Sequence, residues 1–60
     1  MPTNDELKEW IKIIQEEGHD LSVWEENFVE SISEQLDKKG FLSERQIEVL
    51  ERIYSEKTPL

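Results

Sequence analysis

The sequence predicts the end of one helix and the start of the next within Gly40-Phe41-Leu42-Ser43-Glu44-Arg45-Gln46-Ile47. Gly40 suits a helix end because glycine adopts the left-handed backbone conformation without a steric penalty. Ser43 and Gln46 fit a capping box, in which each side chain accepts a hydrogen bond from the backbone amide of the other residue. Leu42 and Ile47 have the spacing of a hydrophobic staple, which fixes the direction of the second helix. A connection this short favours two antiparallel helices.

Two further helix starts share this pattern. Thr3-Asn4-Asp5-Glu6 and Ser22-Val23-Trp24-Glu25 also fit the capping box. We expect Gly18 to end the first helix in the left-handed conformation, and Pro59 bounds the last one. No segment alternates apolar and polar residues with a period of two, so no strand is expected. The expected fold is all-α: one domain over residues 1–60, a small three-helix bundle with a central antiparallel helical hairpin and helices near 4–17, 22–39 and 44–57.

Apolar residues recur along each predicted helix at spacings of three and four, which places them on one face. In the first helix, Trp10 and Ile14 should provide most of the contact with the other two. The second and third helices should form the tighter pair. The expected core of this pair consists of the apolar positions that both faces contribute: Trp24, Phe28, Ile32, Leu36, Ile47 and Leu50.

The composition restricts the classes of function. The chain has 60 residues, of which 35% are hydrophobic and 37% charged, and it contains no cysteine. Disulfides, thiolate metal sites and thiol catalysis are therefore excluded. No apolar run is long enough to cross a membrane and no basic signal region is present, so we expect a cytoplasmic protein without a membrane partner. The net charge of -8 opposes binding to phosphate backbones, so nucleic acid is not an expected direct partner.

His19 and Asp20 are the residues that most resemble a catalytic pair, because the carboxylate could orient the imidazole as a base. No serine, cysteine or further carboxylate has the spacing to complete a triad. Glu16 and Glu17 could collect a cation together with this pair, but no metal-binding spacing such as H-E-x-x-H is present. We therefore predict no catalytic residue, no cofactor and no metal.

An acidic column lies along the second predicted helix. Glu26, Glu30 and Glu34 are four residues apart, and like charges at this spacing cost about 0.2–0.5 kcal/mol per pair. The column is a solvated face, a docking face for a basic protein, or a mimic of DNA phosphates. Three apolar residues lie off the main apolar faces: Ile13, Val23 and Val49. They either complete the core or contact a partner, including a second copy in a homodimer. We predict that Glu26, Glu30, Glu34, Ile13 and Val49 bind a partner.

A longer pattern runs from Leu21 to about Thr58. It contains Trp24-Glu25 with Phe28, followed by Leu42-Ser43-Glu44-Arg45-Gln46. It resembles the helical W-E-x-x-F and L-S-x-[KR]-Q segment of phage-encoded replication and recombination proteins. The resemblance implies a helical fold and an association with nucleic-acid-processing proteins, and it brings no catalytic residue to this chain. We expect a non-enzymatic acidic accessory module that binds a protein of a phage or bacterial nucleic-acid-processing system. The alternative is an acidic inhibitor or DNA mimic that binds a basic cleft.

Overall fold

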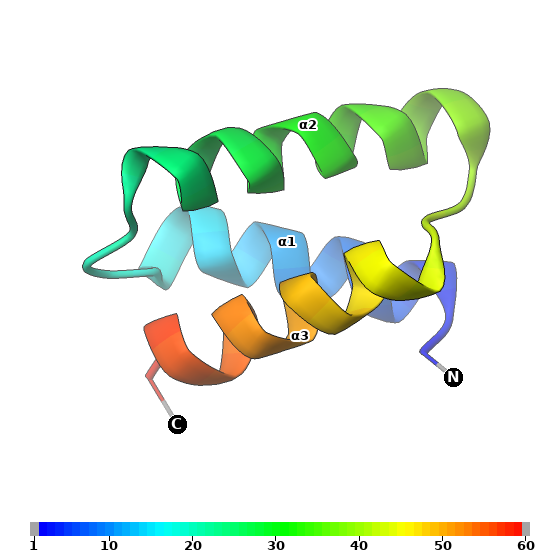
Figure 1. Ribbon diagram of the computed structural model, residues 1–60. Helices are drawn as coiled ribbons and strands as arrows, with labels where there is room; N and C mark the ends of the chain where they lie inside the picture. Colours follow the sequence, from blue (N-terminus) through cyan, green and yellow to red (C-terminus); the bar gives the residue numbers. More distant parts are fainter. Residues whose placement is uncertain (1, 60) are drawn as a thin grey trace.

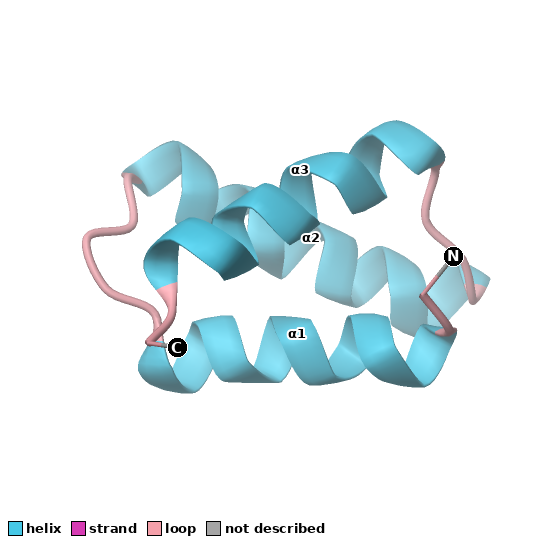
Figure 2. Ribbon diagram, turned by 90° about the horizontal axis from the view of Figure 1, so that it is seen from below, coloured by secondary structure: helices cyan, strands magenta, loops and turns pink. Residues whose placement is uncertain are grey.

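A computed structural model describes residues 2–59 and contains helices α1 (Asn4–Glu17), α2 (Val23–Lys39) and α3 (Glu44–Lys57). No strand occurs among these residues, as Figures 1 and 2 show. α2 runs antiparallel to α1 and α3, which point in the same direction (Figure 1). The Cα radius of gyration is 10.4 Å. The structure therefore confirms an all-α, small three-helix bundle.

Side-chain caps begin all three helices. Ser22 Oγ accepts a hydrogen bond from the Glu25 amide at 3.1 Å, while Glu25 Oε1 accepts one from the Ser22 amide at 2.8 Å. Ser43 and Gln46 form the same reciprocal pair before α3, at 3.2 and 2.9 Å. Thr3 caps α1 by accepting a hydrogen bond from the Glu6 amide. Because the caps form where the patterns predict them, the predicted boundaries agree with the structure to within one residue.

The two glycines end their helices in different ways. Gly40 has a φ of 79°, in the left-handed region, as predicted. The prediction was wrong for Gly18, which has a φ of -66° and extended backbone. Its amide donates a hydrogen bond to the Ile14 carbonyl, and a Cβ atom at Gly18 would overlap that carbonyl oxygen. Glycine is therefore required here by close approach, and the left-handed residue of this loop is Asp20, with a φ of 56°.

The core draws apolar side chains from all three helices and from the second loop. Its buried residues are Leu7, Ile11, Ile14, Val29, Ile32, Leu36, Leu42, Leu50 and Ile53. Of the residues predicted for the core, Ile32, Leu36 and Leu50 are therefore confirmed. Phe28 and Ile47 are partly buried and pack against its edge. The prediction was wrong for Trp24, which is 61% exposed.

α1 contributes more to the packing than the sequence suggested. Its residues Leu7, Ile11 and Ile14 are buried, and the helix packs against both α2 and α3. α2 and α3 form the predicted antiparallel hairpin, but α1 and α3 are the most closely packed pair, so the prediction that α2 and α3 are the tighter pair was wrong. The ring of Trp10 in α1 stacks on Tyr54 of α3, with centroids 5.4 Å apart. This contact adds to the buried aliphatic face of α1.

Candidate functional site

The exposed indole of Trp24 lies in the first turn of α2. It stacks on the ring of Phe28, one helical turn later, with centroids 5.2 Å apart and planes inclined by 12°. Phe28 in turn packs against the core. Trp24 is thus held in place from one side while most of its surface remains in contact with water.

Trp24 and Phe28 precede Gln35 by 11 and 7 residues, about three and two helical turns, so all three lie on the same face of α2. Val49 lies on the corresponding side of α3. The side chains of Gln35 in α2 and Gln46 in α3 donate to each other at 3.0 and 2.9 Å, which places these two residues opposite one another. Val49 follows Gln46 by three residues, so it lies on the flank of α3 that faces α2. It is partly buried and packs against the core. We name Trp24, Phe28 and Val49 the Trp24 surface.

Ile13 belongs to α1 and is half-buried. It follows Trp10 by three residues, and Trp10 stacks on Tyr54. Tyr54 follows Val49 by five residues, which corresponds to a rotation of about 140° around α3. The structure therefore does not bring Ile13 and Val49 together.

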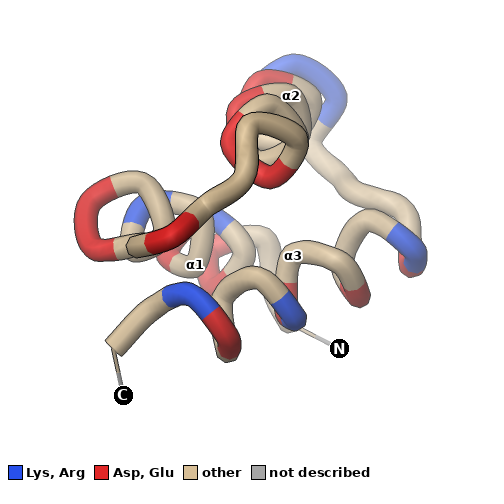
Figure 3. The backbone as a smooth tube through the Cα atoms, turned by 60° about the vertical axis from the view of Figure 1, so that its left-hand side comes forward, with Lys and Arg blue, Asp and Glu red and all other residues tan. Residues whose placement is uncertain are grey.

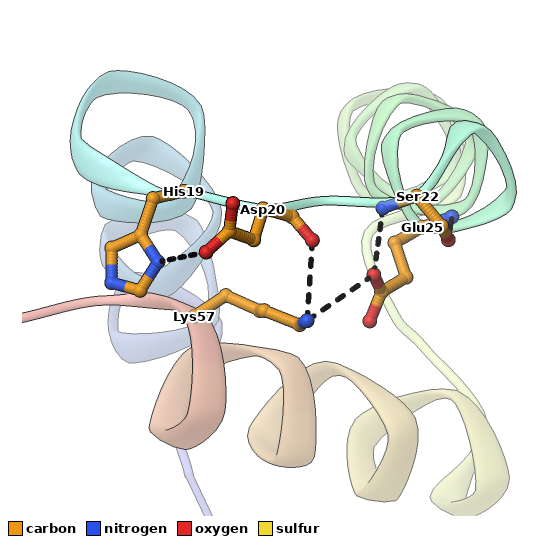
Figure 4. A network of polar contacts seen from close by, with 5 residues as sticks. All are labelled: His19, Asp20, Ser22, Glu25 and Lys57. Atoms are coloured by element: carbon orange, nitrogen blue, oxygen red, sulfur yellow. Dashed lines mark hydrogen bonds and ion pairs between the residues drawn. The ribbon is translucent and has the colours of Figure 1, made fainter.

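A polar network joins the start of α2 to the end of α3 (Figure 4). Lys57 Nζ donates a hydrogen bond to the Asp20 carbonyl at 3.2 Å and lies 4.0 Å from Glu25 Oε1. The same carboxylate oxygen accepts the hydrogen bond from the Ser22 amide. We name these four residues the Lys57 network. It fixes the first turn of α2, and therefore the position of Trp24, relative to α3.

The electrostatics of the Lys57 network favour a charged Glu25. The hydrogen bond from the Ser22 amide lowers the pKa of Glu25 below its ordinary value of 4.5. Burial acts in the opposite direction, whereas the nearby positive charges of Lys57 and Arg52 lower the pKa further. The Glu25 and Lys57 side chains are 19% and 25% exposed, so water only partly screens their attraction.

His19 and Asp20 are close together but open to water. His19 Nδ1 lies 3.6 Å from Asp20 Oδ2, and the two side chains are 59% and 90% exposed. The His19 amide donates a hydrogen bond to the Lys57 carbonyl, which adds a backbone contact beside the Lys57 network. Within residues 2–59, the side chains of Glu16, Glu17, His19 and Asp20 do not form a group that could hold a metal ion.

The acidic column of α2 divides into two parts. Glu34 Oε1 accepts a hydrogen bond from Lys38 Nζ at 2.6 Å. Glu26 and Glu30 instead line a groove between α1 and α2, together with apolar residues of both helices. Figure 3 shows further acidic positions on α1 and α3, and basic positions near the end of α2 and along α3. The negative charge is therefore distributed over the molecule, and Glu26 and Glu30 are the residues of the acidic column that line the groove between α1 and α2.

The exposure of Trp24 was missed at the sequence level, although one signal could have shown it. Each step of four residues along a helix exceeds a full turn by about 40°. Trp24 precedes Leu36 by three such steps, so it is rotated by about 120° from a residue that is buried. The groove between α1 and α2 depends on the packing of two helices and has no comparable sequence signal.

In the part of the chain that the structure describes, no helix has the length and apolarity needed to cross a membrane. Comparisons of the chain with protein-family models, curated proteins and solved structures find no match.

Proposed function

We propose that this protein is a non-enzymatic interaction module that binds a protein partner through the Trp24 surface. The observation that carries the proposal is the exposure of Trp24, whose large apolar side chain keeps 61% of its surface in water. Tryptophan is enriched among the residues that contribute most to protein–protein binding. Its exposure in water is unfavourable, and a partner that covers it would recover the free energy of burying an aromatic side chain.

The rigidity of the Trp24 surface also supports binding. Phe28 limits the movement of the indole by stacking on it, and the Lys57 network holds the turn from which it projects. A side chain that is ordered before binding loses little conformational entropy in a complex. This makes the Trp24 surface a better anchor than an isolated exposed aromatic residue on a loop.

We expect the partner to be a protein of a nucleic-acid-processing system in the cytoplasm of a bacterium or of a phage-infected cell. The resemblance of the segment from Leu21 to about Thr58 to phage-encoded replication and recombination proteins supports this choice. The net charge of -8 favours a protein partner over direct contact with nucleic acid. A homodimer through the Trp24 surface is the competing arrangement, and the same net charge on both copies opposes it.

Paired aromatic variants test the proposal. Trp24→Ala removes the proposed anchor, whereas Phe41→Ala removes a 60% exposed aromatic residue from the loop between α2 and α3. Proteins retained from a bacterial lysate by the wild-type chain are identified, and their affinities for each purified variant are then measured by calorimetry. We expect Trp24→Ala to weaken binding by about 30-fold or more, and Phe41→Ala to leave it nearly unchanged. Equal affinity of wild type and Trp24→Ala would contradict the proposal, and sedimentation of the wild-type chain alone would reveal a dimer.

An acidic inhibitor or DNA mimic that binds a basic cleft is the second candidate. The distribution of acidic residues over all three helices favours it, because a mimic presents charge over an extended surface (Figure 3). The salt dependence of the affinity distinguishes the two candidate functions. Affinity for the partner should fall steeply with added salt if charge dominates, and only slightly if the Trp24 surface dominates.

A further inference from the structure

The groove between α1 and α2 is a separate feature from the Trp24 surface. Its apolar lining consists of Leu21, which is partly exposed, and of the buried residues Ile14 and Val29, which lie beneath it. Glu26 and Glu30 contribute carboxylates. Its volume of about 400 Å³ falls within the range of about 300–1,000 Å³ that is typical of ligand sites. It is open to solvent, so it suits a single side chain of a partner better than an enclosed small molecule.

Gly18 lines the groove at the end of α1. A Cβ atom here would approach the Leu21 Cδ1 atom to 3.2 Å besides overlapping the Ile14 carbonyl oxygen. A side chain at position 18 would therefore displace the loop that forms this end of the groove.

The carboxylates of the groove are available to a cation from outside. Glu26 and Glu30 are exposed, and the ion pairs formed within residues 2–59 involve other carboxylates. Residues four apart on a helix have Cβ atoms about 5–6 Å apart, so one cation placed between the two side chains can contact both. Such a cation would also relieve their mutual repulsion.

An arginine side chain matches both the charge and the apolar lining of the groove. Its planar guanidinium donates several hydrogen bonds to carboxylates and is more weakly hydrated than the ammonium of lysine. Its aliphatic part can cover apolar surface while its charged end remains partly in water. We infer that the groove binds an arginine side chain from a basic segment of a protein partner, with the guanidinium between Glu26 and Glu30 and the aliphatic part against Leu21.

This arginine site is independent of the Trp24 surface. Trp24 precedes Glu26 by two residues, which corresponds to a rotation of about 200° around α2. The two surfaces therefore lie on opposite flanks of the helix, and loss of one should leave the other intact.

A nuclear magnetic resonance titration tests the arginine site directly. The probe is the capped tripeptide acetyl-Ala-Arg-Ala-amide, and its control carries citrulline, which is uncharged and nearly the same shape. We expect the arginine peptide to shift the backbone amide signals of Gln15, Gly18 and Leu21, and the citrulline peptide to bind at least about tenfold more weakly. A lysine peptide should bind more weakly than the arginine peptide.

Charge-matched double variants locate the site. Glu26→Gln with Glu30→Gln should weaken binding of the arginine peptide at least about tenfold, whereas Glu9→Gln with Glu51→Gln removes the same charge elsewhere and should change it by less than about twofold. Trp24→Ala should bind the peptide as the wild type does, which separates this result from a failure of the Trp24 surface. Equal losses in the two double variants, signals shifted over all acidic surfaces, or no shifted signals would each overturn the inference.

Discussion

Trp24 and Leu50 are both large apolar residues, yet their exposure to water differs completely. Leu50 is 0% exposed at the centre of the core, whereas Trp24 keeps 61% of its surface in solvent. The contribution of an apolar side chain to stability depends mainly on the area it removes from water and on the cavity its truncation leaves. Stability and binding should therefore depend on different residues of this chain.

Truncation of Leu50 and of Trp24 to alanine should lower the free energy of unfolding by different amounts. We expect Leu50→Ala to reduce the free energy of unfolding by about 2–5 kcal/mol, because it creates a cavity. Trp24→Ala removes the stacking contact with Phe28 and should reduce it by less than about 1.5 kcal/mol. Urea unfolding followed by circular dichroism measures both values. A larger loss for Trp24→Ala than for Leu50→Ala would contradict the arrangement of the core.

Glu25 should make the stability of the protein depend on pH. Because its pKa in the folded state lies below the ordinary value of 4.5, the folded state favours the charged carboxylate more than the unfolded state does. The resulting stabilisation is present above pH 4.5 and is lost as the pH falls through the folded-state pKa. Urea midpoints measured between neutral and acidic pH should therefore fall less steeply for Glu25→Gln than for wild type. Glu51→Gln removes an equal charge from the exposed face of α3, and the urea midpoints of this variant should fall with pH as steeply as those of the wild type.

The ends of the helices show which features of an element are local. A cap joins residues three apart, so the starts of α1, α2 and α3 could be predicted from the sequence. The helix ends were harder to predict, because Gly18 and Gly40 are the same residue type but have different backbone conformations. Gly18 lies close to the Ile14 carbonyl oxygen in the last turn of α1, whereas the space around Gly40 is open. This difference in packing cannot be predicted from the residue type.

Substitutions should distinguish the two reasons for glycine: the left-handed backbone conformation at Gly40 and the lack of space for a side chain at Gly18. Gly40→Ala places a side chain at positive φ and should cost about 1–2 kcal/mol, of which Gly40→Asn recovers a part because asparagine tolerates this conformation. Gly18→Ala forces the Ile14 carbonyl to move and should cost at least about 1 kcal/mol through the weakened cap. Gly18→Asn should be no better than Gly18→Ala. Thermal unfolding of the four variants measures these effects. If Gly18→Asn were more stable than Gly18→Ala, close approach would not be the reason for glycine at position 18.

At the scale of the whole molecule, α1 determines whether the other two helices have a core to pack on. Its buried face and its stacking contact with α3 were underestimated at the sequence level, because the docking of a helix depends on partners far away in the chain. The same limitation applies to the candidate site. The residues of the acidic column could be identified from their spacing, but the groove beside Glu26 and Glu30 exists only where α1 lies against α2.

Removal of α1 provides a test at this scale. A chain of residues 19–60 keeps α2 and α3, but it lacks the buried face of α1, against which both of these helices pack. We expect this chain to lose cooperative thermal unfolding and much of its helical circular dichroism signal. Most of the stability of a helix in a protein comes from the packing of its apolar face, which α2 and α3 would lose in part. The full chain at the same concentration is the control. A cooperative transition in the shortened chain would show that α2 and α3 form a stable hairpin alone.

The different surroundings of Trp10 and Trp24 also provide two fluorescent reporters. Trp10 is partly buried against Tyr54, so the emission of a Trp24→Phe chain should report unfolding of the bundle. Trp24 is mostly in water, so the emission of a Trp10→Phe chain should move to shorter wavelength when a partner covers it. The protein can thus signal loss of its fold and occupation of its surface through separate residues, without an attached dye.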